Sequence, residues 1–175
     1  MKVLGLLGWS GSGKTHLLTR LLPLLIARGL SVSTVKHAHH GFDLDQPGKD
    51  SYQHREAGAR EVLIASGRRW ALMHELDQSE PPLADLLARM APVDLVLVEG
   101  FKSNPHPKIE VFRPSLGQQP FWPERTDVVA VATDDVIIDC PHPVFDLGQP
   151  AAIAAWCLGF LGLARDMNDA AQPDS

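Results

Sequence analysis

The 175-residue sequence has little of what marks several common protein classes. Its two cysteines, Cys140 and Cys157, form neither a C-x-x-C pair nor a disulfide framework, so we expect reduced thiols in the cytoplasm. A net charge of −5 offers no basic field for nucleic acid. The most apolar stretch, residues 151–164, is shorter than the roughly 20 residues that span a bilayer. We therefore expect no nucleic-acid partner, no membrane partner and no signal peptide.

The sequence also lacks repeats and low-complexity tracts, and no Ser-His-Asp or paired-carboxylate arrangement can be argued from its spacing. Its apolar content of 45% and charged content of 21% are ordinary for a globular chain. The length fits one domain, which we expect over residues 1–164. Residues 165–175 are polar and aperiodic, and this pattern predicts a disordered tail.

Apolar, strand-like runs alternate with segments of helical periodicity along the chain. This alternation predicts an α/β fold of the P-loop NTPase-like, three-layer type, with a mostly parallel sheet and helices on both faces. The expected strands are residues 3–7, 31–36, 61–65, 69–74, 93–99, 109–112 and 128–132. The expected helices are residues 14–28, 50–59, 81–90 and 151–164. Residues 114–125, rich in proline and glutamine, predict an exposed loop or flap.

The clearest motif is G-W-S-G-S-G-K-T at residues 8–15, which fits G-x-x-x-x-G-K-[ST] between an apolar run and a leucine-rich helix. In such a loop, backbone N–H groups surround a phosphate, Lys14 reaches the β and γ oxygens, and the Thr15 hydroxyl ligates Mg²⁺. A glycine-rich turn without a ligand is the alternative, and the two matching flanks disfavour it. The predicted nucleotide-binding residues here are Gly8, Ser10, Gly11, Ser12, Gly13, Lys14, Thr15 and His16.

Glu99 ends the apolar run at residues 93–99, where open α/β sheets place their ligands. P-loop proteins need a carboxylate there to hold Mg²⁺ or the water around it. A solvated strand end is the alternative. We predict that Glu99 positions metal or water, together with Thr15 and with Asp43 as a further metal ligand. We assign no other catalytic residue, so the chemistry expected is at most slow, Mg²⁺-dependent nucleotide hydrolysis.

Residues 36–51 form a second polar cluster after the second expected strand. P-loop switch proteins sense the γ-phosphate at this place, although a merely solvated loop is the alternative. The histidines at positions 37, 39 and 40 suggest a metal, yet no sulfur or carboxylate completes a familiar zinc spacing. The candidate switch residues are Lys36, His37, His39, Asp45, Lys49 and Asp50.

Thr133-Asp134-Asp135 follows the last expected strand. An aspartate there can accept hydrogen bonds from guanine N1 and its amino group, so Asp135, or Asp134, is a candidate for base recognition. The fuller N-K-x-D pattern is absent, and T-x-D often marks only a turn.

These motifs together resemble the molybdopterin-guanine dinucleotide biosynthesis adaptor family, MobB. The resemblance rests on the loop at 8–15 and on four further motifs: V-K-H-A-H-H at 35–40, D-Q-P-G-K-D-S at 45–51, A-G-A at 57–59 and L-V-E-G-F-K at 97–102. Their order and spacing hold over residues 2–113, and more loosely to 135.

The resemblance implies a GTP-binding protein with weak hydrolysis, a Mg²⁺ cofactor and a homodimeric state. Its implied role is to assist the molybdopterin guanylyltransferase that joins GMP to molybdopterin. By the same resemblance, residues 10–15 contact phosphates, Glu99 helps to hold Mg²⁺, and residues 37–51 form a responsive loop near the pterin.

Two other classes stay open. A P-loop small-molecule kinase would use the same loop, but such kinases close a lid with several arginines, and residues 114–125 contain only Arg125, with Arg113 just before. A metallocentre-assembly GTPase that handles nickel or cobalt would use the histidine cluster.

Overall fold

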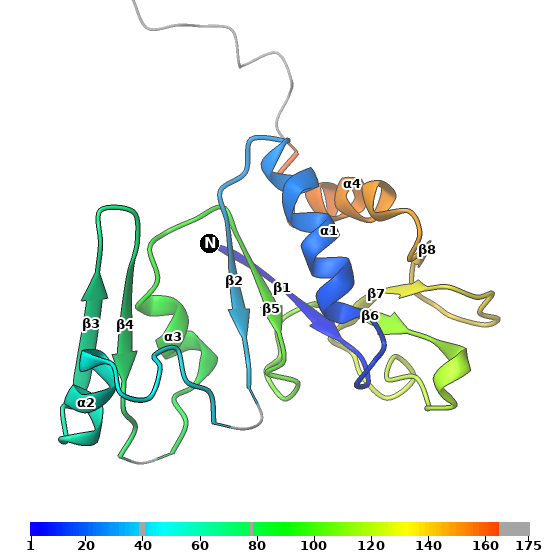
Figure 1. Cartoon of the computed structure of the whole chain (residues 1–175). Coiled ribbons are helices and arrows are strands. Elements are labelled where there is room, and N and C mark those ends of the chain that lie inside the picture. Colours follow the sequence, from blue (N-terminus) through cyan, green and yellow to red (C-terminus); the bar gives the residue numbers. More distant parts are fainter. Residues whose placement is uncertain (39–40, 78, 165–175) are drawn as a thin grey trace, which may run out of the picture. The chain divides into compact units, whose positions relative to one another are not determined.

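The computed structural model describes residues 1–38, 41–77 and 79–164, and these residues form two compact units (Figure 1). The first unit contains residues 1–37 and 91–164, and the second contains residues 38–90. The sequence led us to expect one domain. The second unit is set apart because its two strands pair only with each other, outside the main sheet. The predicted tail at 165–175 lies outside the described residues.

The first unit is built on a six-stranded sheet in which every neighbouring pair is parallel. Its order is β2-β5-β1-β6-β7-β8. The strands are β1 (Lys2–Leu7), β2 (Val32–Lys36), β5 (Leu95–Glu99), β6 (Lys108–Phe112), β7 (Val128–Thr133) and β8 (Val144–Asp146). The prediction of an α/β fold with a mostly parallel sheet is confirmed. Only β8 was missed in this unit, because three residues are too few to show a periodicity.

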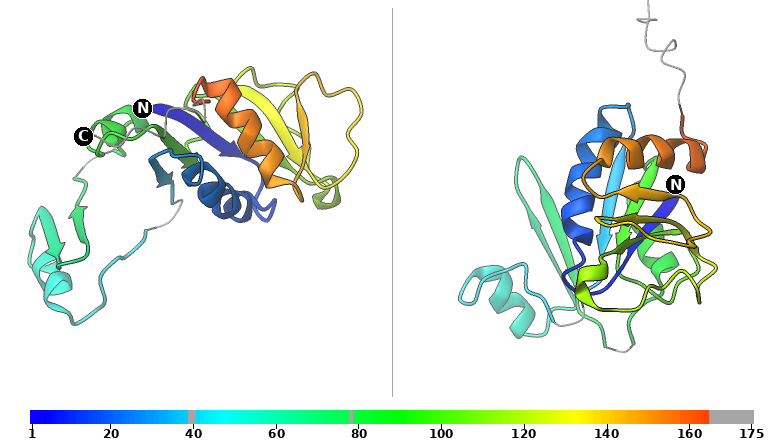
Figure 2. Two further views of the ribbon diagram at one scale, coloured as in Figure 1. Left: turned by 90° about the horizontal axis from the view of Figure 1, so that it is seen from above. Right: turned by 90° about the vertical axis from the view of Figure 1, so that its right-hand side faces the viewer.

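Two helices, α1 (Lys14–Ile26) and α4 (Pro150–Leu161), pack side by side on one face of this sheet (Figure 2). Leucines one turn apart in α1, Leu17, Leu21 and Leu25, are buried against the sheet. They share one core with Ile153 and Cys157 of α4. Burial raises the pKa of the Cys157 thiol to about 12, which makes it an inert core side chain.

On the face of the sheet away from α1, strand β6 presents two buried polar side chains, Lys108 and Glu110. The Glu110 carboxylate accepts hydrogen bonds from the N–H groups of Phe121 and Trp122, each at 2.9 Å. Burial raises the Glu110 pKa, although these two hydrogen bonds oppose the rise. The segment at 114–125 is exposed over residues 115–119, as the sequence predicts, and it is anchored to the sheet at Phe121 and Trp122.

The second unit contains an antiparallel hairpin of β3 (Glu61–Ala65) and β4 (Trp70–His74), with α2 (Asp50–Glu56) and α3 (Leu83–Ala88). Helix α3 is shorter than predicted, because Pro82 adopts an extended conformation before the helix begins. Helix α2 also ends earlier than predicted, because Gly58 has a positive φ of 97°, which is incompatible with a continued right-handed helix. Among the residues that the structure describes, no helix is long and apolar enough to cross a membrane.

Candidate nucleotide site

The predicted site residues of the first unit meet at the carboxyl edge of the parallel sheet. Strands β1 and β5 are neighbours, with Leu6 opposite Glu99, so the loop that leaves β1 lies beside the end of β5. A cavity of about 310 Å³ lies between them. Its walls are Ser10, Gly11, Gly13, Lys14, Thr15, His16 and Glu99. The structure thus brings together seven of the residues that the sequence indicated.

The loop at residues 8–13, between β1 and α1, has a shape that requires glycine. Gly8, Gly11 and Gly13 have φ angles of 151°, 77° and 98°, which residues with a side chain rarely adopt. A Cβ atom on Gly8 would also lie 2.5 Å from the Val111 carbonyl oxygen and 2.6 Å from Ser12 Oγ. Among the described residues, the buried Ser12 Oγ has no hydrogen-bond partner. The loop therefore offers a polar atom and main-chain amides to a ligand.

The Lys14 side chain folds back against this loop. Its ammonium group donates hydrogen bonds to the carbonyl oxygens of Gly8 at 3.1 Å and Trp9 at 2.8 Å. Burial lowers the Lys14 pKa, and the nearby ammonium groups of Lys102 and Lys36 lower it further, while Glu99 opposes the shift. Three lysine side chains therefore gather near one loop, and their mutual repulsion is relieved by an anion.

Thr15 and Glu99 form the next part of the site. The Thr15 hydroxyl lies 2.8 Å from Glu99 Oε1 and 3.0 Å from Oε2, and it donates to the carboxylate. A hydroxyl and a carboxylate are hard oxygen donors of the kind that Mg²⁺ prefers. The two side chains that the sequence assigned to Mg²⁺ from this unit are therefore adjacent, and their chemistry fits that ion.

The chain turns sharply just after Glu99. Gly100 and Phe101 both have positive φ angles, 103° and 47°. A Cβ atom on Gly100 would lie only 2.4 Å from the Cβ of His37. The His37 N–H donates to the Glu99 carbonyl oxygen at 2.8 Å, and its ring stacks on Phe101 with centroids 4.7 Å apart. Lys36 lies opposite Glu99 in the sheet register, so two predicted switch residues adjoin Glu99 through the main chain.

The other predicted switch residues belong to the second unit. There Arg55 pairs with Asp43 at 2.9 Å and Asp45 at 3.2 Å, and the hydrogen bond to Asp45 raises the Arg55 pKa. Lys49 immediately precedes α2 in an extended conformation, and Asp50 is the first residue of that helix. His39 lies outside the described residues. Within residues 1–38, 41–77 and 79–164, no group of three or more His, Cys, Asp or Glu side chains could hold a metal. The metal role of Asp43 stays a prediction.

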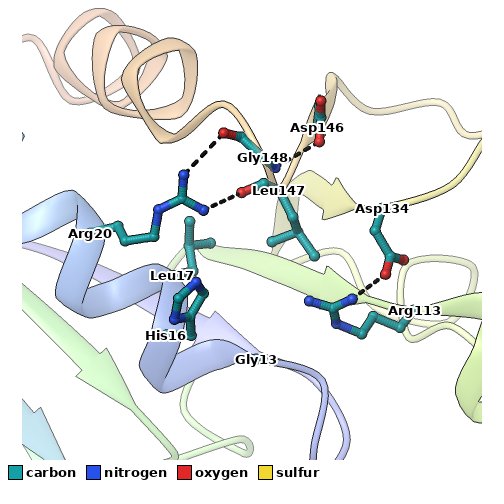
Figure 3. Close-up of a pocket in the computed structure, with 9 residues that line it drawn as sticks. All are labelled: Gly13, His16, Leu17, Arg20, Arg113, Asp134, Asp146, Leu147 and Gly148. Atoms are coloured by element: carbon teal, nitrogen blue, oxygen red, sulfur yellow. Dashed lines mark hydrogen bonds and ion pairs between the residues drawn. The ribbon is translucent and has the colours of Figure 1, made fainter.

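A second cavity, of about 270 Å³, adjoins the loop and shares Gly13 and His16 with the first (Figure 3). Its other walls include Arg20 of α1, Arg113 and Asp134 after β6 and β7, and Asp146 of β8. Asp135 is not one of its lining residues. The Asp135 carboxylate instead accepts the N–H of Val136 at 2.7 Å, within its own turn.

The sequence missed Asp146 and Arg20 because neither belongs to a recognised motif. It also left the orientation of Trp9 open. The Trp9 ring stacks on Phe121 with centroids 4.9 Å apart, and its Nε1–H donates to the Gln119 carbonyl oxygen at 2.8 Å. Lys102 Nζ lies over both rings, at 5.6 and 5.7 Å from their centroids. The loop is therefore joined to the segment at 114–125.

With this geometry established, comparison with known proteins identifies the family. Residues 3–134 match the family model described as "Molybdopterin guanine dinucleotide synthesis protein B", MobB. The chain belongs to the MobB family. The resemblance drawn from the motifs is confirmed.

Relatives in this family extend over most of the chain. The molybdopterin-guanine dinucleotide biosynthesis adapter protein of Escherichia coli is 47% identical over 75% of this chain and 78% of its own length. The adapter protein of Haemophilus influenzae is 41% identical over 87% of this chain and 85% of its own. The crystal structure of a MobB homologue from Bacillus stearothermophilus is 26% identical and covers 94% of this chain and all of its own, with a TM-score of 0.69. The chain is therefore an adapter of molybdopterin guanine dinucleotide biosynthesis, with the fold of that family.

Proposed function

We propose that this MobB family member binds GTP with Mg²⁺ and assists the guanylyltransferase that attaches GMP to molybdopterin. The observation that carries the proposal is the loop at residues 8–15, whose glycines, Lys14 and Thr15 stand at the end of β1 beside Glu99. Main-chain amides at a helix start, with an ammonium group and a hydroxyl, make up a phosphate site.

The local charge supports a triphosphate as the ligand. Lys14, Lys36 and Lys102 are near enough for the last two to lower the Lys14 pKa. A bound triphosphate would favour the charged form of all three lysines, and Mg²⁺ held by Thr15 and Glu99 would offset the remaining negative charge. Lys14 would then exchange its contacts with the Gly8 and Trp9 carbonyl oxygens for phosphate oxygens.

The arginines near the site support slow turnover. Rapid phosphoryl transfer needs a cation over the transferred group. Arg125 is held by Asp127, at 2.9 Å from Nε, and by the Lys102 carbonyl oxygen. Arg113 donates from Nε to the Ser12 carbonyl oxygen at 2.9 Å and pairs with Asp134. Because these guanidinium groups are already engaged, an adapter with at most slow GTPase activity fits better than a small-molecule kinase.

The alternative of a GTPase that handles nickel or cobalt gains no support from His37, because its ring stacks on Phe101.

The homodimer implied by the resemblance remains part of our proposal. Apolar side chains of the β3–β4 hairpin support it, because Leu63 is 60% exposed and Trp70 69% exposed in the single chain. Sedimentation velocity tests this part, and a monomer at micromolar concentration would contradict it.

The experiment for the main proposal is formation of the guanine dinucleotide cofactor by purified guanylyltransferase, with molybdopterin and Mg²⁺–GTP. Added wild-type chain should raise the yield, whereas Lys14→Ala should not. Lys2→Ala is the matched control, since Lys2 is exposed at the opposite end of β1. Equal stimulation by wild type and Lys14→Ala would show that the adapter role does not need the nucleotide site.

A further inference from the structure

The second cavity lies next to the loop that we assign to phosphates, and it shares the lining residues Gly13 and His16 with that site. Figure 3 shows it between α1, the end of β7 and the turn after β8. Leu17 and Leu147 form the apolar part of its wall, and charged side chains form much of the rest. A flat ring system with apolar faces and a polar edge suits such a cavity.

The turn that forms one wall is held rigidly. Arg20 reaches across from α1 and donates to the carbonyl oxygens of Leu147 at 2.9 Å and Gly148 at 3.0 Å (Figure 3). The Leu147 N–H donates to the Thr133 carbonyl oxygen at 2.7 Å, which ties the turn to β7. The Gly148 N–H donates to Asp146 Oδ1 at 2.6 Å and fixes that carboxylate. A fixed carboxylate on a rigid turn is well suited to read hydrogen-bond donors.

Three aspartates near this cavity differ in what they already bind. Asp135 accepts the Val136 N–H and is not a lining residue. Asp134 pairs with Arg113, which is in turn bound to the loop carbonyl of Ser12. Asp146 lines the cavity and accepts a main-chain N–H, and among the described residues no cation pairs with it.

We propose that this cavity takes the base of the bound nucleotide and that Asp146 is the residue that selects guanine. This assignment rests on the proposed binding of a nucleoside triphosphate at residues 8–15. Guanine presents two donors on one edge, N1–H and the 2-amino group, and a carboxylate accepts both. Adenine presents an unprotonated N1 and no 2-amino group there. The N1 lone pair would therefore face the carboxylate oxygens, and no hydrogen bond would form. Arg20 acts as a positioning residue through the turn.

Calorimetric titrations with GTP and inosine triphosphate, each with Mg²⁺, test the unmodified protein. Hypoxanthine lacks only the 2-amino group of guanine, so inosine triphosphate should bind about 10-fold more weakly than GTP, as the loss of one charge-assisted hydrogen bond requires. Equal affinities for the two nucleotides would overturn the assignment.

The substitution Asp146→Asn gives a sharper test, because the asparagine Oδ1 can still accept the Gly148 N–H and keep the turn. Xanthine carries a carbonyl at position 2, to which an asparagine amide can donate. GTP affinity should therefore fall about 10- to 100-fold, and affinity for xanthosine triphosphate should rise by a similar factor. A purely structural role for Asp146 predicts no such exchange of preference.

Asp135→Asn is the matched control, because Asp135 does not line the cavity, and it should retain the preference for GTP. An exchange of preference in this control, or its absence in Asp146→Asn, would overturn the role of Asp146 while leaving phosphate binding intact. Failure of the wild-type chain to bind any of the nucleotides would overturn the proposed function itself, and this assignment with it.

Discussion

The Thr15 hydroxyl donates a hydrogen bond to the Glu99 carboxylate, 2.8 Å from Oε1 and 3.0 Å from Oε2. These residues are 84 positions apart in the chain, and the parallel pairing of β1 with β5 brings them together. The hydrogen bond holds the Thr15 hydroxyl and the Glu99 carboxylate, two groups whose oxygen atoms can bind a metal, in place beside the loop. Because the same oxygens suit Mg²⁺, the pair is arranged in advance for the metal.

Glu99→Gln should therefore reduce the effect of Mg²⁺ on nucleotide affinity. The amide oxygen can still accept from Thr15, but the negative charge that attracts the metal is lost. We expect the gain in GTP affinity on adding Mg²⁺ to shrink about 10-fold, as removal of one charged ligand implies. Titrations with Mg²⁺ and with EDTA measure this gain. Glu124→Gln, at an exposed glutamate of the same unit, should behave as wild type. An unchanged Mg²⁺ effect in Glu99→Gln would refute the metal role.

Trp9 offers a test of how the loop is joined to the segment at 114–125. Removing its ring in Trp9→Ala loses the stacking on Phe121 and the hydrogen bond to Gln119. Amide hydrogen exchange in residues 115–119 should accelerate about 10-fold, the effect of roughly 1–2 kcal/mol. Trp70→Ala, at an exposed tryptophan of the second unit, is the control. Exchange at the wild-type rate in Trp9→Ala would mean that Trp9 does not help to anchor the segment.

Lys108 is the buried centre of a polar cluster on the face of the sheet away from α1. It is 1% exposed, and its ammonium group donates to the carbonyl oxygens of Asn104 and His106 and to Asp127 at 2.6 Å. Burial lowers the Lys108 pKa despite the opposing effect of Asp127, while Arg125 and Lys108 hold the Asp127 pKa well below its usual range. The cluster fixes the segment that follows Glu99.

Lys108→Met should lower the free energy of unfolding by about 3–5 kcal/mol, because it leaves two carbonyl oxygens and part of a carboxylate buried without this donor. Urea denaturation at fixed protein concentration measures the change. Lys2→Met, the same substitution at an exposed position of β1, should stay within about 0.5 kcal/mol of wild type. A loss below about 1 kcal/mol in Lys108→Met would show that the cluster can rearrange.

His106 gives the fold a pH dependence. Both of its ring nitrogens are buried and, in the part of the chain that the structure describes, have no hydrogen-bond partner. Burial, aided by the Lys108 charge, lowers its pKa from 6.5 to about 4. The unfolded chain therefore binds a proton more readily, and stability present above pH 6.5 is lost as the pH falls toward 4.

We expect this histidine to cost about 2 kcal/mol of stability between pH 7 and pH 5. His106→Phe keeps a planar ring against Gly5 and removes the titration, so its unfolding free energy should change less over this range. Urea denaturation at the two pH values compares the variants. Parallel pH profiles of wild type and His106→Phe would contradict the prediction.

Local motifs made much of this structure predictable. The glycines, lysine and threonine of residues 8–15 define a loop whose flanks were also visible as an apolar strand and a leucine-striped helix. Glu99 could be placed because it ends a nearly all-apolar strand, and parallel strands end at one edge. The sequence did not indicate that Lys36 and His37 adjoin Glu99, which follows from the pairing of β2 with β5.

What escaped prediction depends on contacts between distant residues. Strand β8 is three residues long and is defined by pairing with β7, so Asp146 had no local signal. The anchoring of the segment at 114–125 arises from Glu110, a polar residue buried in a strand whose partners are main-chain groups. The separate second unit could not be seen because strand patterns do not show which strands pair.

The central claim is that residues 8–15 bind a nucleoside triphosphate, and calorimetric titration with Mg²⁺–GTP tests it most directly. We expect one GTP per chain for the wild type and for Lys2→Ala, and binding at least about 100-fold weaker for Lys14→Ala, because an ammonium group on phosphate oxygens is lost. No binding by the wild type, or equal affinity in Lys14→Ala, would contradict it.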